Sequence, residues 1–307
     1  MSRPGARLQL VAAAALFSTG GAAVKATDLT SWQVAGFRAG IAALTLLLLV
    51  PSARRGWTLR ALGVGVLYAA TLTMYVQANK LTTAANAIFL QGTAPLYVLA
   101  LSPLLLGERV RPRDLLFMLA IALGLGLFFL GDEAPLATAP DPFTGNLLAA
   151  ATGLGWGLTM LGLRALGRDD ATAGLAPVVL GNLVAFFGCL PFAIPDTLAT
   201  GFGDLGDVSI VVYLGVFQVA VAYILVMSGI RSVPALEASL LLMIEPTFGP
   251  FWAWLVHTEI PGPWSLAGGA LVLGATLFKS VMDAPRPAVL HNDTSTTTPP
   301  GRAEHDS

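Results

Sequence analysis

Ten long apolar segments follow one another along the chain, and they constrain its fold more than any other feature. A transmembrane helix needs about 20 mostly apolar residues. Runs of this kind occupy residues 8–26, 31–50, 59–79, 84–106, 114–131, 143–163, 174–195, 208–230, 235–256 and 263–281. Charged residues make up 11% of the chain, against roughly 25% in a soluble protein. The sequence therefore predicts an all-α integral membrane protein with ten transmembrane helices.

Basic residues gather in alternate connections between these segments. If the N-terminus lies in the cytoplasm, 14 of the 17 Lys and Arg residues fall on the inner side, Lys25 and Lys80 fall on the outer side, and Arg38 lies within a segment. Cytoplasmic loops are enriched in Lys and Arg. We therefore expect a multi-pass protein of the cytoplasmic membrane with both termini in the cytoplasm. Arg outnumbers Lys by 14 to 3 and Ala and Gly are plentiful, which is typical of a GC-rich bacterial genome.

The remaining parts of the chain are short. Residues 1–7 form a cytoplasmic N-terminus, residues 132–142 form an outer linker, and residues 282–307 form a polar tail rich in Pro and Thr, which we predict to be disordered. The basic start and the first apolar run also match a secretory signal peptide. The internal repeat favours the alternative, in which this run stays as a transmembrane helix.

The chain contains an internal repeat. Residues 80–109 (KLTTAANAIFLQGTAPLYVLALSPLLLGER) align with residues 231–260 (RSVPALEASLLLMIEPTFGPFWAWLVHTEI) at a constant offset of 151. The matched positions are Lys80 with Arg231, Pro95 with Pro246, Glu108 with Glu259 and, in a weaker alignment, Lys25 with Arg164. Five segments in each half force the second half to enter the membrane from the opposite side. We therefore expect two inverted five-helix repeats, residues 8–131 and 143–281, a plan that suits alternating access in secondary transporters.

Three stretches carry a resemblance to a known family. They are FRAG (37–40), TTAANAIFLQGTAPLYVLALSPLLLGERV (82–110) and AYILVMSGIRSVPALEASLLLMIEPTFGPFWAWLVHTEI (222–260). With the five-plus-five plan, they resemble the EamA-type transporters of the drug/metabolite transporter superfamily. The resemblance implies a carrier for small organic metabolites such as amino acids or related solutes, often an exporter. The chain departs from the family pattern at Thr258, where the family usually has glycine before the glutamate.

Glu245 lies near the middle of the ninth segment, and Pro246 follows it directly. A charge at the bilayer centre costs ~2.5–3.5 kcal/mol on insertion scales, so an intramembrane carboxyl is a candidate site residue. Pro246 removes a backbone donor, and we predict that it and Pro95 kink their helices and take part in gating. Glu245 could contact a substrate amine or accept a coupling proton. Alternatively, it is a protonated or hydrogen-bonded carboxyl that locks the helices together.

Arg38 is the one basic residue within a segment, and it lies between Gly36 and Gly40, whose spacing permits close helix approach. Arg38 could attract an anionic group. The alternative, which we favour, is that the side chain extends toward the membrane surface or that its five donors bond helix ends.

Other polar and aromatic residues in the central segments are candidates for lining a substrate cavity. They are Ser18, Thr19, Tyr75, Gln77, Asn86, Gln91, Thr93, Trp156, Thr159, Gln218, Tyr223, Glu237 and Ser239. Trp156 is the foremost of these because it lies deep in its segment and could stack on a ligand. For each one, packing or hydrogen bonding between helices is the competing explanation.

The sequence offers little support for catalysis. GFGD (201–204) matches a motif of intramembrane aspartyl proteases, but Asp204 falls in a polar loop and no second membrane-centred aspartate is present. We find no zinc-protease, P-loop or nucleophile-elbow motif, and the single Cys189 and three scattered histidines suggest no metal site. We therefore expect no enzymatic activity and no cofactor.

The function that we predict is secondary transport without ATP. The expected partners are the lipid bilayer and a small-molecule substrate, with protons as a candidate coupling ion and no nucleic acid. The alternatives are a membrane-embedded receptor or scaffold without flux and an intramembrane enzyme.

Overall fold

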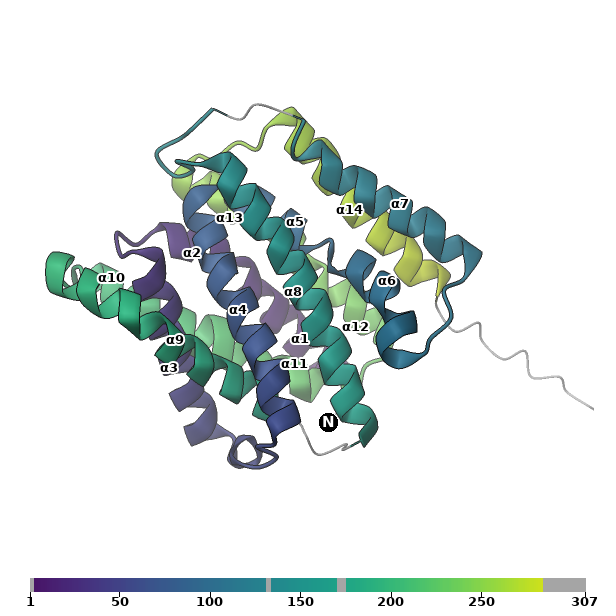
Figure 1. The fold of residues 1–307 in the computed structure, drawn as a ribbon, viewed down its shortest axis with the longest axis horizontal. Helices are drawn as coiled ribbons and strands as arrows, with labels where there is room; N and C mark the ends of the chain where they lie inside the picture. The colour runs from purple at the N-terminus through teal and green to yellow at the C-terminus, as the bar shows by residue number, and fades with distance from the viewer. Residues whose placement is uncertain (1–2, 131–133, 170–174, 284–307) are drawn as a thin grey trace, which may run out of the picture.

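The computed structural model describes residues 3–130, 134–169 and 175–283, which are almost entirely helical (Figure 1). Nine stretches of the described chain are long and apolar enough to cross a membrane. They are Pro4–Lys25, Ser31–Leu49, Leu59–Leu81, Ala84–Leu106, Pro142–Leu166, Ala176–Thr200, Leu205–Gly229, Glu237–His257 and Pro263–Met282. The prediction of an all-α protein with many apolar spans is thus confirmed. Residues 284–307 of the predicted disordered tail (282–307) lie outside the described residues, whereas Met282 ends the last helix.

Several of these spans consist of more than one helix. The helices up to residue 130 are α1 (Arg3–Ser18), α2 (Gly20–Lys25), α3 (Ser31–Leu49), the short 3₁₀ turn η1 (Pro51–Arg54), α4 (Leu59–Leu81), α5 (Ala84–Gln91), α6 (Ala94–Leu106) and α7 (Pro112–Leu127). The later helices are α8 (Pro142–Asp169), α9 (Ala176–Thr200), α10 (Leu205–Tyr213), the π-helix η2 (Leu214–Val221), α11 (Ala222–Gly229), α12 (Ala235–Leu242), α13 (Ile244–His257) and α14 (Pro263–Met282).

The fifth predicted segment, 114–131, corresponds to α7, which has 16 residues. At 1.5 Å per residue, α7 is about 24 Å long, somewhat less than a ~30 Å hydrocarbon core. Pro112 stands at the start of α7, where its missing N–H costs nothing, and the backbone N–H of Arg111 donates to Asp114 at 2.9 Å. α7 packs along α14 at one side of the molecule (Figure 1).

Two spans break into separate helices just before the prolines that the repeat aligns. α5 ends at Gln91 and α6 begins at Ala94, with Pro95 in its first turn; α12 ends at Leu242, and Pro246 lies in the first turn of α13. Proline cannot donate to the carbonyl four residues earlier, and it is accommodated best in the first turn of a helix. Each proline therefore favours the start of a new helix.

Close approach between helices depends on small residues, as expected in a bilayer. A Cβ atom added to Gly65 of α4 would lie 2.9 Å from the backbone nitrogen of Gly181 in α9. Gly36 and Gly40 of α3 meet α9 in the same way, at Cys189 and Phe186. The glycine pair around Arg38 thus holds α3 against α9.

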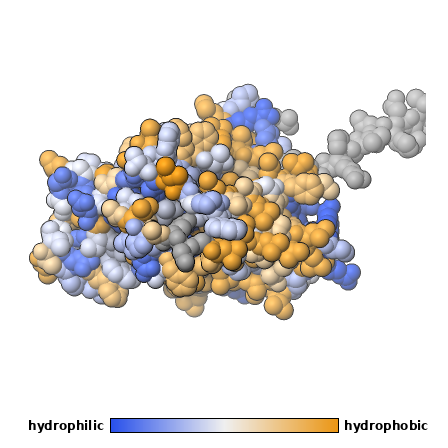
Figure 2. Space-filling view, turned by 90° about the horizontal axis from the view of Figure 1, so that it is seen from above, coloured by the Kyte–Doolittle hydropathy of each residue, from blue (hydrophilic) through white to orange (hydrophobic). Residues whose placement is uncertain are grey.

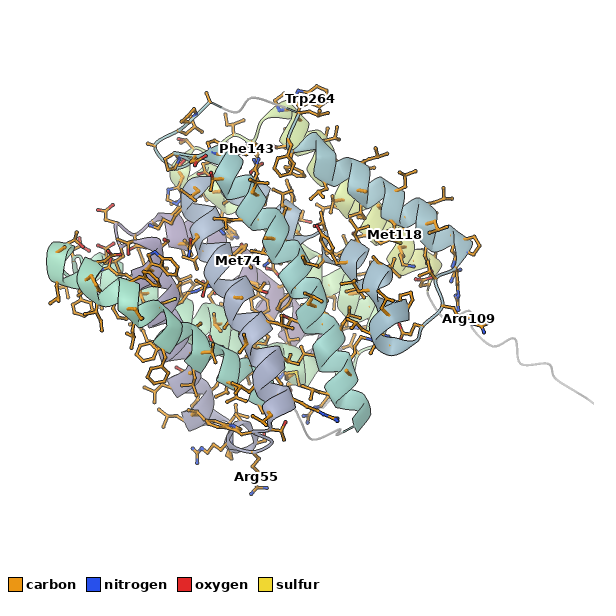
Figure 3. The ribbon with its side chains drawn as sticks, in the orientation of Figure 1. Arg55, Met74, Arg109, Met118, Phe143 and Trp264 are labelled. Carbon is orange, nitrogen blue, oxygen red and sulfur yellow. The ribbon has the colours of Figure 1, made fainter. Side chains whose placement is uncertain are left out.

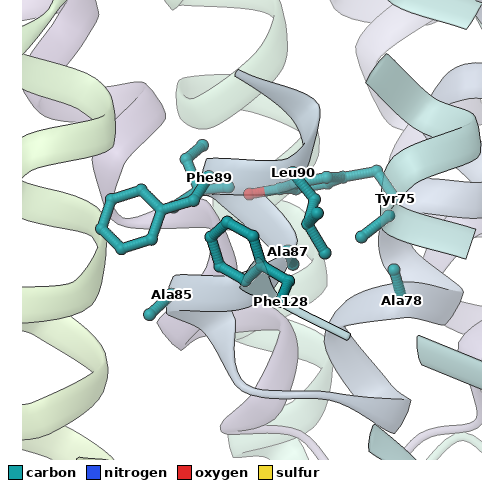
Figure 4. Packing of buried hydrophobic residues seen from close by; sticks show 9 residues of the cluster. Tyr75, Ala78, Ala85, Ala87, Phe89, Leu90 and Phe128 are labelled. Atoms are coloured by element: carbon teal, nitrogen blue, oxygen red, sulfur yellow. The ribbon is translucent and has the colours of Figure 1, made fainter. Parts of the chain in front are cut away.

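The core surrounds α5, whose residues from Ala84 to Leu90 are all buried. Phe89 packs beside Phe128 with ring centroids 6.3 Å apart, and Tyr75 and Leu90 lie close to them (Figure 4). Hydrophobic residues also cover much of the outer surface, including the side on which α7 and α14 lie (Figure 2). Such a surface suits a lipid environment.

Three of the connections mark two opposite ends of the bundle. Arg55, between α3 and α4, lies at one end, and Phe143 and Trp264, at the starts of α8 and α14, lie at the other (Figure 3). The chain begins at the same end as Arg55 (Figure 1). This agrees with the alternation expected from the sequence, which assigns Arg55 to the inner side.

Candidate functional site

A cavity of about 110 Å³ lies between helices from both parts of the chain. Residues 6–130 contribute Phe17, Arg38, Leu72, Tyr75 and Gln91 to its lining, and residues 143–281 contribute Trp156, Gln218, Val219, Tyr223 and Glu245. Seven of the predicted candidates are thereby brought together from distant positions in the sequence. Larger hollows exist; one of about 500 Å³ lies between α3, α9 and α10 and is lined by apolar residues, several of them exposed.

Irregular backbone surrounds this cavity. Gln91 is the last residue of α5, Glu245 is in the first turn of α13, and Gln218 and Val219 belong to the π-helix η2. Non-helical backbone at membrane depth is tolerated where it is buried in protein or lines a cavity, and short π-helical turns are frequent at functional sites. The helix breaks therefore coincide with the place where a solute could bind.

Arg38 and Glu245 bring a guanidinium and a carboxyl group to the same cavity. The Arg38 side chain is 2% exposed, and its Nη2 donates to the carbonyl oxygen of Leu72 at 3.1 Å. Glu245 lies at the N-terminal end of α13, which favours negative charge. In the described part of the chain these two residues do not form an ion pair with each other. A ligand with a negative and a positive group could therefore contact both.

Aromatic rings form one wall of the site. Tyr223 meets Phe17 edge to face at 5.5 Å and Tyr68 at 5.8 Å between ring centroids. Tyr68 in turn lies 6.2 Å from Trp156. Phe17, Trp156 and Tyr223 of this group line the cavity, and Tyr68 packs behind them. Aromatic faces stack on planar groups and attract cations.

Eight predicted candidates lie outside the cavity lining: Ser18, Thr19, Gln77, Asn86, Thr93, Thr159, Glu237 and Ser239. Asn86 Nδ2 donates to Oγ1 of Thr82 at 3.3 Å and to Oδ1 of Asn146 at 3.1 Å, which links α5 to α8. Thr93 Oγ1 donates to the carbonyl of Leu90 at 2.6 Å and lies against Gly153. The contacts of both residues are those of helix packing, the competing explanation for polar residues in these segments.

Sequence reasoning did not single out Phe17, Leu72 and Val219, which also line the cavity. Each is an apolar residue in an apolar segment, so its position toward the cavity leaves no mark in the sequence. Ser18 and Thr19, at the break between α1 and α2, bond across the bundle instead: Ser18 Oγ accepts from Nε1 of Trp252 at 3.0 Å, and Thr19 Oγ1 lies 2.8 Å from the hydroxyl of Tyr213.

These features define a polytopic helical membrane protein with a small, polar and aromatic cavity at its centre. The pattern of the EamA-like transporter family matches residues 6–130 and, a second time, residues 143–281. The chain belongs to the EamA-like transporter family, which confirms the resemblance found in its sequence.

Individual relatives point the same way. An uncharacterized transporter of Archaeoglobus fulgidus is 28% identical over 218 residues, which are 71% of this chain and 74% of that protein. The uncharacterized transporter YetK of Bacillus subtilis is 24% identical over 208 residues, 67% of this chain and 62% of its own length. A solved crystal structure with 22% identity has a TM-score of 0.56 over 92% of this chain and 99% of its own. At that identity the likeness concerns the fold alone.

Proposed function

We propose that this protein is a secondary carrier that moves small organic metabolites, such as amino acids or related solutes, across the cytoplasmic membrane by alternating access. The observation that carries the proposal is the central cavity, to which residues 6–130 and 143–281 contribute five side chains each. A site at the junction of two inverted repeats is the usual plan of such carriers. The names of the relatives, both called transporters, add support.

The proposed architecture is ten transmembrane helices in two inverted five-helix repeats, residues 8–131 and 143–281. Two observations support it. The family pattern matches the chain twice, once in each part, and the helix breaks before Pro95 and Pro246 occupy aligned positions. In this plan α7 is the fifth transmembrane helix, which adds to the nine long apolar stretches and is shorter than each of them.

The lining of the cavity supports a small zwitterionic or polar substrate. Arg38 would bind a carboxylate, and Glu245 would bind an amine or take up a proton when the substrate leaves. Trp156 and Tyr223 would pack against the body of the solute. In the conformation described, the cavity of about 110 Å³ has room for a molecule with few non-hydrogen atoms. We propose export as the direction and protons as the coupling ion; the family likeness supports the first, and the carboxyl at the site supports the second.

Transport in liposomes tests the proposal. The purified protein would be reconstituted, and the vesicles would be loaded with a ¹³C-labelled metabolite extract of cells, freed of nucleotides, and incubated with the same extract unlabelled. Mass spectrometry of the outer medium then identifies any solute that exchanges without ATP. We expect exchange of one or a few small zwitterionic solutes. Protein that stays folded in the vesicles, binds a solute and exchanges none would instead be a receptor.

A further inference from the structure

A buried ion pair fastens one end of the bundle. Nζ of Lys25 lies 2.8 Å from Oε1 of Glu259, and each side chain is 2% exposed. Lys25 is the last residue of α2, and Glu259 follows the end of α13, so the pair joins the two parts of the chain. Loss of either partner would leave a buried charge without compensation, which is strongly unfavourable. This end therefore stays closed while the pair is intact.

Both residues of this pair also form hydrogen bonds at the start of α5. Lys25 Nζ also donates to the carbonyl oxygen of Thr82 at 2.7 Å, and Oε2 of Glu259 accepts from the backbone N–H of Ala84 at 2.9 Å. Ala84 is the first residue of α5, and a helix N-terminus favours a carboxylate. Glu259 therefore holds the end of α13 on the start of α5, and the two helices pack together.

A second ion pair consists of the two residues that the repeat aligns with Lys25 and Glu259. Arg164 Nη2 lies 2.8 Å from Oε1 of Glu108, but these side chains are 50% and 32% exposed. Arg164 aligns with Lys25, and Glu108 aligns with Glu259. Each pair thus takes its cation from one repeat and its anion from the other, and exchanging the repeats converts one pair into its counterpart.

The two pairs lie at opposite ends of the bundle. Asn146, near the start of α8, accepts from Thr82 at 2.7 Å, and Thr82 is itself a partner of Lys25. Arg164 is 18 residues further along the same helix, which corresponds to about 27 Å along its axis. α8 runs from the end marked by Phe143 toward the opposite end (Figure 3).

The helices are packed more closely at the end with the buried pair than at the end with the exposed pair. α5 is buried from Ala84 to Leu90 and packs on α13. Its aligned counterpart is α12, where Ala238 is the one buried residue between Glu237 and Leu242, and in the described residues α12 forms no comparable contact with α6. The bundle is therefore tight at the Lys25 end and loose at the Arg164 end.

We propose that the Lys25–Glu259 and Arg164–Glu108 pairs are alternating closures that determine which side the central cavity faces. In this structure the first pair is buried and its end is shut. When the carrier faces the other way, the second pair becomes buried, and Glu108 fastens α6 to the start of α12. The inference rests on the proposed carrier function, because a protein without two facing states has no use for two such closures. Lys25, Glu259, Arg164 and Glu108 are positioning residues, distinct from those that contact substrate.

Side-specific labelling of a cysteine in the cavity tests this inference. Cys189 is the single cysteine, so Cys189→Ser provides a cysteine-free background, and Leu72→Cys places a reporter in the cavity lining. A membrane-impermeant maleimide is added from one side at a time, with sealed vesicles of both orientations. In this parent protein we expect labelling from the Arg164 side to be about tenfold faster than from the Lys25 side, or more, since coupling of this kind typically amounts to 5–150-fold.

Two matched double variants carry the test. Lys25→Met with Glu259→Gln removes both charges of the first pair, so no unpaired charge stays buried, and the glutamine amide can still accept from Ala84. We expect labelling from the Lys25 side to rise about tenfold. Arg164→Met with Glu108→Gln should instead lower the rate of labelling from the Lys25 side below that of the parent protein. Changes of the same sign in both double variants, or an unchanged ratio in both, would overturn the inference.

Labelling requires neither a known substrate nor flux, so the inference and the proposed function can fail separately. Opposite shifts in the two double variants without exchange of any solute would uphold the two closures and refute the carrier. Exchange of a solute with an unchanged labelling ratio would uphold the carrier and refute the closures. Thermal melting of each variant, followed by size-exclusion chromatography in detergent, checks that the protein examined is folded.

Discussion

Arg38 and Glu245 line one cavity from different parts of the chain, yet they do not pair with each other in the described structure. Two buried opposite charges usually meet, because each lowers the cost of burying its partner. Here the guanidinium bonds a backbone carbonyl and the carboxyl lies at a helix N-terminus. The proposed function assigns both groups to a ligand that carries both charges.

Replacing the carboxyl at the cavity by an amide should impair transport. We expect Glu245→Gln to lower the exchange rate about tenfold or more and to remove its dependence on pH, because an amide cannot take up a coupling proton. Exchange measured in liposomes across a pH series checks this. Glu237→Gln is the matched control, since Glu237 is 32% exposed and pairs with Arg7, and it should transport normally. Unchanged exchange in Glu245→Gln at every pH would leave this residue a structural role.

The guanidinium of Arg38 should be required for solutes with a carboxylate. Arg38→Lys keeps the charge but loses the planar fork that binds carboxylates bidentately. We expect this variant to insert and melt nearly as the parent does, while KM for an anionic or zwitterionic solute rises about tenfold. If Arg38→Lys instead lowers the melting temperature and leaves KM unchanged, Arg38 serves to bond the backbone of α4 through Leu72.

The indole of Trp156 should affect selectivity more than stability. Aromatic contacts contribute about 0.5–1.5 kcal/mol each beyond area burial. We therefore expect Trp156→Ala to weaken binding of a solute with a planar or cationic body by about 2- to 13-fold, and Trp156→Phe to restore most of it. Competition between unlabelled solutes in the exchange assay measures the change. Equal loss for every solute in both variants would indicate a role in packing instead.

Two glycines in α4 should differ sharply in their tolerance of a methyl group. A Cβ on Gly65 would lie 2.9 Å from the backbone of Gly181, whereas nothing lies within 4 Å of a Cβ on Gly63. Overpacking of this kind costs typically 1–3 kcal/mol, so Gly65→Ala should lower the melting temperature in detergent. Gly63→Ala should leave it unchanged or raise it slightly. Similar melting of the two variants would show that α4 and α9 are less closely packed than described.

Single neutralisation of the buried ion pair should be far more harmful than loss of an exposed pair. Lys25→Met leaves the carboxylate of Glu259 buried and alone, which costs about 3–5 kcal/mol. Arg113→Met breaks a pair with Asp283 whose side chains are 44% and 41% exposed, which costs about 0–1 kcal/mol. Thermal melting of both variants compares them. A destabilised Arg113→Met with an unaffected Lys25→Met would contradict the described burial.

The sequence predicts the all-helical class and the positions of most apolar spans well because lipid imposes a simple rule. Every span must be apolar for most of its length, and charge marks the connections. The predicted segment 31–50 corresponds to α3 at Ser31–Leu49, and segment 263–281 corresponds to α14 at Pro263–Met282. α8 continues to Asp169, six residues beyond its predicted end, because a helix can extend past the hydrocarbon once its residues are polar.

The cavity is predicted less completely, for two physical reasons. Polar and aromatic residues stand out in apolar segments, and seven of the candidates chosen in this way line the cavity. However, a polar residue can equally bond a neighbouring helix, as Asn86 does, or the backbone of its own segment, as Thr93 does. Conversely, Phe17 and Val219 line the cavity, but apolar residues of these types are equally common at lipid-facing positions. The π-helix at Gln218 also leaves no pattern in the sequence, since its cause lies in the packing around it.

The measurement that tests the central claim most directly is solute exchange by the purified protein in liposomes, compared between the parent and Glu245→Gln. The account predicts that the parent exchanges a small zwitterionic solute from a ¹³C-labelled metabolite extract without ATP, and that Glu245→Gln exchanges it about tenfold more slowly while Glu237→Gln does not. Folded parent protein that exchanges no solute of the extract, or Glu245→Gln protein that exchanges as fast as the parent, would contradict it.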